Sequence, residues 1–149
     1  MDLRPMATQP ENIQPSKFDL VIIGGGFTGT TLAAQLLRAS PSLSVLVLEK
    51  TGSVGRGLAY GTECSSLLLN VRARNMSAFA DDPQHFLRWA QANCDPTVSS
   101  GSFLPRAVYG RYVHALLNEA VSSTGGRRLE WVQDQALGLS LPHPLHSRL

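Results

Sequence analysis

The sequence predicts an α/β domain with a parallel sheet, and three observations lead to this fold class. An apolar run, "FDLVII" at residues 18–23, is followed directly by three glycines and then by a segment with helical periodicity. A second apolar run, "LSVLVLEK" at residues 43–50, comes after that segment. Strand, helix and strand in this order form a βαβ unit with parallel strands. The chain has 149 residues, which fits one domain of about 100–200 residues.

Both apolar runs have the character of strands that are buried on both faces of a parallel sheet. Between them, "TGTTLAAQLLRAS" places Leu32, Leu36 and Leu37 with Ala33 on one face of a helix. Pro41 follows at a position where helices stop. The sequence therefore predicts a buried strand, a helix and a second buried strand in residues 18–50.

The remaining elements follow in order along the chain. Residues 51–77 contain four glycines and little periodicity, which predicts a long functional loop. Asp82-Pro83 is typical of a helix start, and Phe86, Leu87 and Ala90 give that helix an apolar face. A further helix over residues 108–123 is expected to end at Gly125-Gly126, and residues 127–141 supply one strand or two short ones.

The chain is divided by this pattern into three parts. Residues 1–17 contain three prolines and no apolar core of a signal peptide, so we expect a flexible leader. Residues 18–141 form the domain. Residues 142–149 resemble neither strand nor helix, and we expect a disordered tail; its His143 and His146 lack further ligands, so no metal site is expected.

Composition limits the classes of partner. The net charge of +2 is too small to indicate nucleic-acid binding, and no apolar run approaches the about 20 residues that span a bilayer. Cys64 and Cys94 lack metal-like spacing, which predicts two free thiols in a reducing compartment. We expect a soluble, cytoplasmic protein.

The three glycines belong to a Gly24-x-Gly26-x-x-Gly29 motif between the first strand and the helix. In this motif one glycine turns tightly, the second admits a pyrophosphate and the third packs helix on strand. Glu49 ends the second strand, where an acidic residue accepts hydrogen bonds from the adenosine ribose and disfavours a 2′-phosphate. The combination predicts a Rossmann-like dinucleotide site; the alternative is an unliganded turn with a solvated Glu49. The glycines alone do not separate FAD from NAD.

Four downstream segments, taken in their order along the chain, resemble segments of one protein family. They are "GRGLAYGT" at residues 55–62, "LLNVRARNMSAF" at 68–79, "DDPQHFLRWA" at 81–90 and "LPRAVYGRYV" at 104–113. The series resembles the N-terminal FAD/NAD(P)-binding region of the flavoprotein family that includes FAD-dependent urate hydroxylase and aspartate N-monooxygenase-like proteins. The resemblance runs from about Phe18 to Leu117 and implies a Rossmann-like FAD/NAD(P)-binding domain.

The resemblance implies FAD as the cofactor and NAD(P)H as co-substrate, with a small-molecule substrate that the sequence does not identify. It implies cofactor contacts from Gly24, Gly25, Gly26, Phe27, Thr28, Gly29, Glu49, Lys50, Arg56, Tyr60, Asn70 and Met76. The last four also have plain structural readings: Tyr60 and Met76 as core residues, Arg56 as a surface charge and Asn70 as a turn residue. Arg106 also has two possible roles: it supports a ligand, or it makes a local contact.

The implied activity is that of a flavin-dependent oxidoreductase or monooxygenase that uses NAD(P)H and O2, with the redox chemistry supplied by the cofactor. We nominate no catalytic residue, and His85 and His114 are expected to be structural. No second glycine motif follows, so we expect an incomplete sheet and either a truncated product or a minimal FAD-binding fragment. The alternatives are an NAD-binding module without flavin and an inactive fragment.

Overall fold

The computed structural model describes residues 18–40, 42–123 and 128–140. Several predictions concern residues outside these ranges. They are the leader, the tail with His143 and His146, the helix end at Gly125-Gly126, and Pro41. Within the described ranges the elements follow in the order β1 (Leu20–Ile23), α1 (Phe27–Ala39), β2 (Val45–Leu48), α2 (Gly57–Tyr60), the 3₁₀ turn η3 (Ala73–Asn75), α3 (His85–Asn93), α4 (Arg106–Ser123) and β3 (Leu129–Val132).

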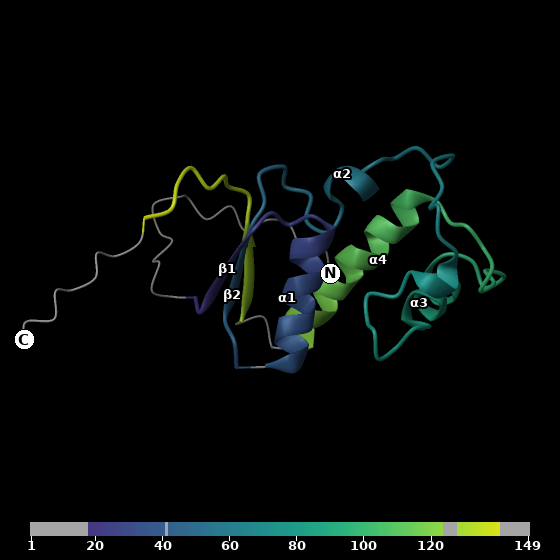
Figure 1. Cartoon of the computed structure of the whole chain (residues 1–149), viewed down its shortest axis with the longest axis horizontal. Helices are drawn as coiled ribbons and strands as arrows, with labels where there is room; N and C mark the ends of the chain where they lie inside the picture. The colour runs from purple at the N-terminus through teal and green to yellow at the C-terminus, as the bar shows by residue number, and fades with distance from the viewer. Residues whose placement is uncertain (1–17, 41, 124–127, 141–149) are drawn as a thin grey trace, which may run out of the picture.

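The strands form one parallel sheet in the order β1-β2-β3, which confirms the predicted α/β fold class. Ile22 is paired with Val47, and Val47 with Trp131. Helices α1 and α4 lie side by side, next to the sheet, and α3 lies farther out (Figure 1). The expected third strand is a single short strand, and residues 133–140 contain no strand.

The burial of β1 corrects the prediction of a strand enclosed on both faces. Ile22 is buried, but its neighbours Val21 and Ile23 are 47% and 68% exposed. Successive strand residues point to opposite faces, and the helices of the described residues cover only the face that carries Ile22, Val45 and Val47. The second face is therefore open at β1 but closed at β2, where Leu46 is 3% exposed, so the prediction of a buried strand is confirmed for β2.

Helix α1 buries a stripe of mostly small residues, and of the three leucines that its periodicity placed on one face only Leu37 is buried. Thr30, Ala33, Ala34 and Leu37 are buried, and these positions have the i, i+3, i+4, i+7 spacing of one helical face. Leu32 is 44% exposed, so its predicted place on the buried face is wrong. The small side chains allow α1 to approach the sheet and α4 closely.

The predicted helix after Asp82-Pro83 is confirmed as α3, and its expected apolar residues Phe86, Leu87 and Ala90 are all buried. Residues 51–77 form the predicted loop, with the addition of two short helical turns, α2 and η3. The predicted helix over residues 108–123 is confirmed as α4, which begins two residues earlier, at Arg106.

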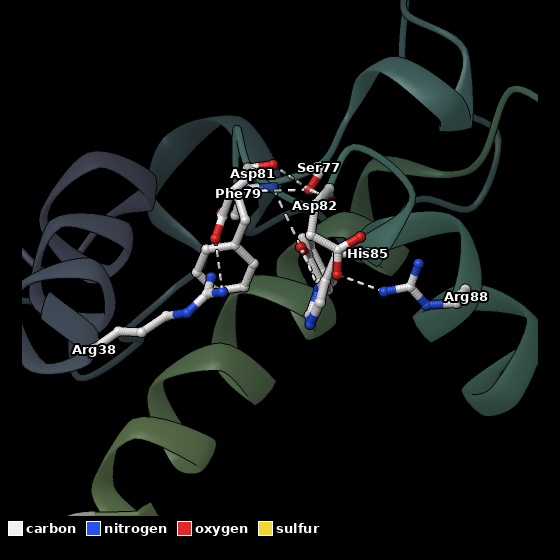
Figure 2. A network of polar contacts seen from close by, with 9 residues as sticks. Arg38, Ser77, Phe79, Asp81, Asp82, His85 and Arg88 are labelled. Atoms are coloured by element: carbon white, nitrogen blue, oxygen red, sulfur yellow. Dashed lines mark hydrogen bonds and ion pairs between the residues drawn. The ribbon is translucent and has the colours of Figure 1, made fainter.

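The segment between η3 and α3 is held by a polar network (Figure 2). Ser77 Oγ donates to the Asp82 carbonyl at 2.6 Å. Arg38 at the end of α1 pairs with Asp81 at 2.9 Å, and its guanidinium lies 4.4 Å from the centre of the Phe79 ring. Asp82 also pairs with Arg88 of α3. These contacts tie the segment to both helices.

Tyr112 is fully buried in α4 and connects to the same segment. Its hydroxyl accepts from the Ala78 N–H at 3.2 Å and lies 2.8 Å from His85 Nδ1. We expect Tyr112→Phe to lower the free energy of unfolding by about 1–3 kcal/mol, because it leaves these groups without their partner. Denaturant unfolding measures this loss.

The control is Tyr109→Phe in the same helix. Tyr109 is similarly buried, but its hydroxyl makes no hydrogen bond within the described residues. A change smaller than about 0.5 kcal/mol is expected there. Equal losses in the two variants would contradict the role given to the Tyr112 hydroxyl.

Candidate functional site

The glycine motif forms the turn between β1 and α1. Gly24 has φ +99°, a left-handed conformation that favours glycine, and its N–H donates to the Leu48 carbonyl at 2.8 Å. Gly29 lies in the first turn of α1, and a Cβ there would lie 1.9 Å from the Gly24 carbonyl oxygen. Two of the three motif glycines are therefore required by backbone geometry, independently of any ligand.

Gly26 is the N-cap residue of α1 and provides no side-chain cap. Its carbonyl accepts from the Thr30 N–H at 3.0 Å, so the helix starts here. The first turn contains no acidic side chain. Uncapped N–H groups and the positive end of the helix dipole favour an anion at this position.

Glu49 follows β2, beside the glycine turn. Its Oε2 accepts from the Gly25 N–H at 2.8 Å, and its Oε1 accepts from the Thr51 N–H at 2.9 Å and the Thr51 hydroxyl at 2.7 Å. The residue is 7% exposed. Burial by itself would raise the pKa of the Glu49 carboxyl, but the bonds from Thr51 and Gly25 outweigh it and hold the pKa below its usual value. The carboxylate is therefore ionised at neutral pH.

Two threonines that were not among the predicted site residues hold this site. Thr30 is fully buried and its hydroxyl donates to the Gly25 carbonyl at 2.9 Å. Thr51 holds the Glu49 carboxylate, as described above. A threonine inside the first helical turns is a signal for a bond to preceding backbone, but the partner could not be named without the fold.

The α2 segment packs on the glycine turn. The Gly55 N–H donates to the Gly25 carbonyl at 2.7 Å. A Cβ on Gly26 would lie 3.6 Å from the Gly57 Cα. The ring centroids of Phe27 and Tyr60 are 5.9 Å apart, and both rings contact the Tyr109 ring of α4. In Figure 1, α2 lies near the start of α1.

The structure thus brings together the motif glycines, Phe27, Glu49 and the segment that carries Arg56 and Tyr60. Thr28 is exposed in the first turn of α1, and Lys50 is exposed two residues after the end of β2. Asn70 is exposed in a bend, and Met76 packs against the core, so their contacts with a cofactor stay predictions.

Three further candidates make local contacts. Arg106 Nε donates to the Leu68 carbonyl at 3.3 Å, which is a local contact, one of the two roles considered for this residue. His85 contacts the Tyr112 hydroxyl, and His114 Nδ1 lies 3.2 Å from the Val54 carbonyl. Both histidines lie in helices and contact neighbouring residues, and their structural role stays a prediction.

Metal-ligating side chains, long apolar helices and cysteines were compared within residues 18–40, 42–123 and 128–140. This part contains no group of three metal-ligating side chains, and none of its helices has the length and apolarity to cross a bilayer. Cys64 and Cys94 are exposed and unbridged.

The residues present fit a dinucleotide. The uncapped first turn of α1 suits a pyrophosphate, and the ionised Glu49 lies one strand away, where a ribose attached to that pyrophosphate would be placed. Three of the four carboxylate lone-pair positions are already used by Gly25 and Thr51, which leaves limited capacity for ribose hydroxyls.

A family model described as FAD-NAD(P)-binding matches residues 21–143. The mitochondrial L-2-hydroxyglutarate dehydrogenase of Pongo abelii is 45% identical over 47 residues, which are 32% of this chain and 11% of that protein. Glucose oxidase 2 of Penicillium expansum is 42% identical over 45 residues, 30% of this chain and 7% of that protein. The matches therefore span about a tenth or less of these relatives' length.

Solved structures with similarity include two crystal forms of OTEMO in complex with FAD and NADP. Form 4 is 22% identical with a TM-score of 0.43, and covers 76% of this chain and 19% of that one. Form 1 is 19% identical with a TM-score of 0.41, and covers 76% of this chain and 18% of that one.

Proposed function

The chain belongs to the FAD-NAD(P)-binding family, and from this premise we propose that its glycine turn binds the ADP part of FAD for a flavin-dependent oxidoreductase. The observation that carries the proposal is the uncapped first turn of α1 beside a buried, ionised Glu49. The pyrophosphate lies at the first turn, and Glu49 accepts from the ribose with its remaining lone-pair capacity. The dinucleotide-binding unit spans residues 18–141.

The contacts beyond the ADP part belong to the same proposal. Phe27 and Thr28 contact the pyrophosphate, Lys50 lies beside the ribose, and the segment of Arg56 and Tyr60 borders the part of FAD beyond the pyrophosphate. Asn70 and Met76 approach the flavin. Bound FAD supplies the redox chemistry, while the protein binds and orients it.

The finer activity is a monooxygenase of the kind that includes FAD-dependent urate hydroxylase, with NAD(P)H as reductant and O2 as oxidant. The series "GRGLAYGT", "LLNVRARNMSAF" and "LPRAVYGRYV" supports it, because an NAD-binding motif alone does not require these segments. The unbridged, exposed cysteines support a reducing, cytoplasmic location.

Parallel calorimetric titrations with FAD, NAD, NADP and ADP test the cofactor. We expect FAD to bind most tightly and ADP to bind more weakly at the same site. NADP is expected to bind worse than NAD, because the Glu49 carboxylate repels a 2′-phosphate. Saturable binding of NAD with none of FAD would favour the NAD-binding alternative. A folded chain that binds none of the four would contradict the proposed function.

A further inference from the structure

A cavity of about 390 Å³ lies between the α2 segment and the start of α4. Its polar lining includes the basic residues Arg56 and Arg111, the acidic residue Glu63 and Ser65, and Val108 contributes apolar surface. This volume is within the usual range for small-molecule sites. The fold and the ADP site described above do not assign it a ligand.

The cavity is next to the glycine turn. Arg56 and Tyr60 line it, and they belong to the segment that Gly55 ties to Gly25. The Tyr60 ring also contacts the ring of Phe27, the first residue of α1. The Tyr60 side chain therefore connects the cavity to the start of α1.

The charge of the cavity favours an organic anion. Arg56 pairs with Glu63 at 3.0 Å, but the side chains are 42% and 86% exposed, so this pair contributes little and is readily exchanged. Arg111 has no carboxylate partner within the described residues and donates to Cys94 Sγ at 3.4 Å, a weak acceptor. Guanidinium groups stay charged and bind carboxylates in bidentate fashion.

We propose that this cavity binds the carboxylate of a small organic substrate, with Arg111 as its principal partner and Arg56 as the second. The Glu63 carboxylate, which also lines the cavity, pairs with Arg56, so a carboxylate can reach Arg56 in this position. The apolar wall at Val108 contacts the body of the molecule. This assignment rests on the proposed function, because the substrate is placed beside the part of FAD beyond the pyrophosphate.

Titration with benzoate tests the assignment, with benzamide as the neutral analogue and inorganic phosphate as a second anion. Binding is followed by calorimetry without FAD and by flavin absorbance with FAD. We expect benzoate to bind in both titrations and to perturb the flavin absorbance, and benzamide to bind at least about tenfold more weakly.

Two variants with opposite expected effects sharpen the test. Arg111→Gln should weaken benzoate binding by about tenfold or more, because a charge-assisted hydrogen bond is lost. Glu63→Gln should strengthen it, because Arg56 loses its competing carboxylate. Arg74→Gln, at an exposed arginine that does not line the cavity, is the control and should leave binding unchanged.

Unchanged benzoate affinity in Arg111→Gln, or weaker affinity in Glu63→Gln, would overturn the proposal. Competition by phosphate as strong as benzoate binding would also overturn it, since the cavity would then be a general anion site or a cofactor-phosphate site. Failure of FAD to bind would contradict the proposed function alone, because calorimetry without FAD still tests the carboxylate. Normal FAD binding without benzoate binding would contradict only this inference.

Discussion

Gly29→Ala should abolish FAD binding and destabilise the domain. A Cβ at Gly29 would lie 1.9 Å from the Gly24 carbonyl oxygen and 3.1 Å from the Ile22 side chain, both in or next to β1. Relief of this overlap requires α1 to move away from the turn, which separates the first turn of the helix from Glu49. We expect a loss of about 1–3 kcal/mol in the free energy of unfolding. Denaturant unfolding and FAD titration measure the two effects.

Gly138→Ala is the matched control, because no atom lies within 4 Å of the added Cβ. It should change neither stability nor FAD binding.

Gly26→Ala should separate FAD binding from folding. Its Cβ would make only an ordinary contact of 3.6 Å with the Gly57 Cα, so the fold should persist while approach of the pyrophosphate is hindered. Tight FAD binding by Gly29→Ala would contradict the packing role of this glycine.

Glu49→Gln should weaken FAD binding and lower stability together. The carboxylate accepts from two backbone N–H groups, at Gly25 and Thr51, and a carboxamide cannot accept from both with separate oxygens. We expect a loss of about 1–3 kcal/mol in the free energy of unfolding. FAD affinity should fall by about tenfold or more, because the ribose loses a charged acceptor. Glu119→Gln, an exposed change in α4, is the control for a lost negative charge.

The stability difference between wild type and Glu49→Gln should depend on pH in a way that identifies the ionised Glu49 carboxylate as its cause. The pKa of Glu49 is lowered in the folded protein, so its ionised form stabilises the fold above the unfolded pKa, and this contribution is lost as pH falls through the folded pKa. The stability difference between wild type and Glu49→Gln should be constant from pH 8 to pH 6 and shrink below about pH 4. Asp19, Asp82 and Asp95 also have lowered pKa values, but both proteins contain them. A difference that grows on acidification would contradict this account.

The parts of the fold that could be predicted are those with local signals. The first βαβ unit could be predicted from two apolar runs and from the spacing of the glycines that form the turn between β1 and α1. Helix α3 could be predicted from Asp82-Pro83 and from the apolar residues that follow. The burial of β1 was predicted wrongly because an apolar strand has the same sequence whether one or both of its faces are covered. Val21 and Ile23 are apolar yet largely exposed.

The site was predictable as a set of residues and not as a set of contacts. The motif glycines and Glu49 could be named because their roles depend on spacing along the chain. The bonds from Thr51 to Glu49 and from Thr30 to Gly25, and the packing of Gly57 on Gly26, depend on how segments fold back on the turn. Periodicity carries no information on such pairings, so Arg56 and Tyr60 could be assigned to the site only through the resemblance.

The flavin absorbance of the purified chain, after reconstitution with FAD and removal of free cofactor, tests the central claim most directly. We predict a yellow protein that retains an equimolar amount of FAD, and loss of that absorbance in Gly29→Ala but not in Gly138→Ala. Circular dichroism establishes that the wild-type chain is folded in the same sample. A folded, colourless protein that retains no flavin would contradict the assignment of the glycine turn and Glu49 to FAD.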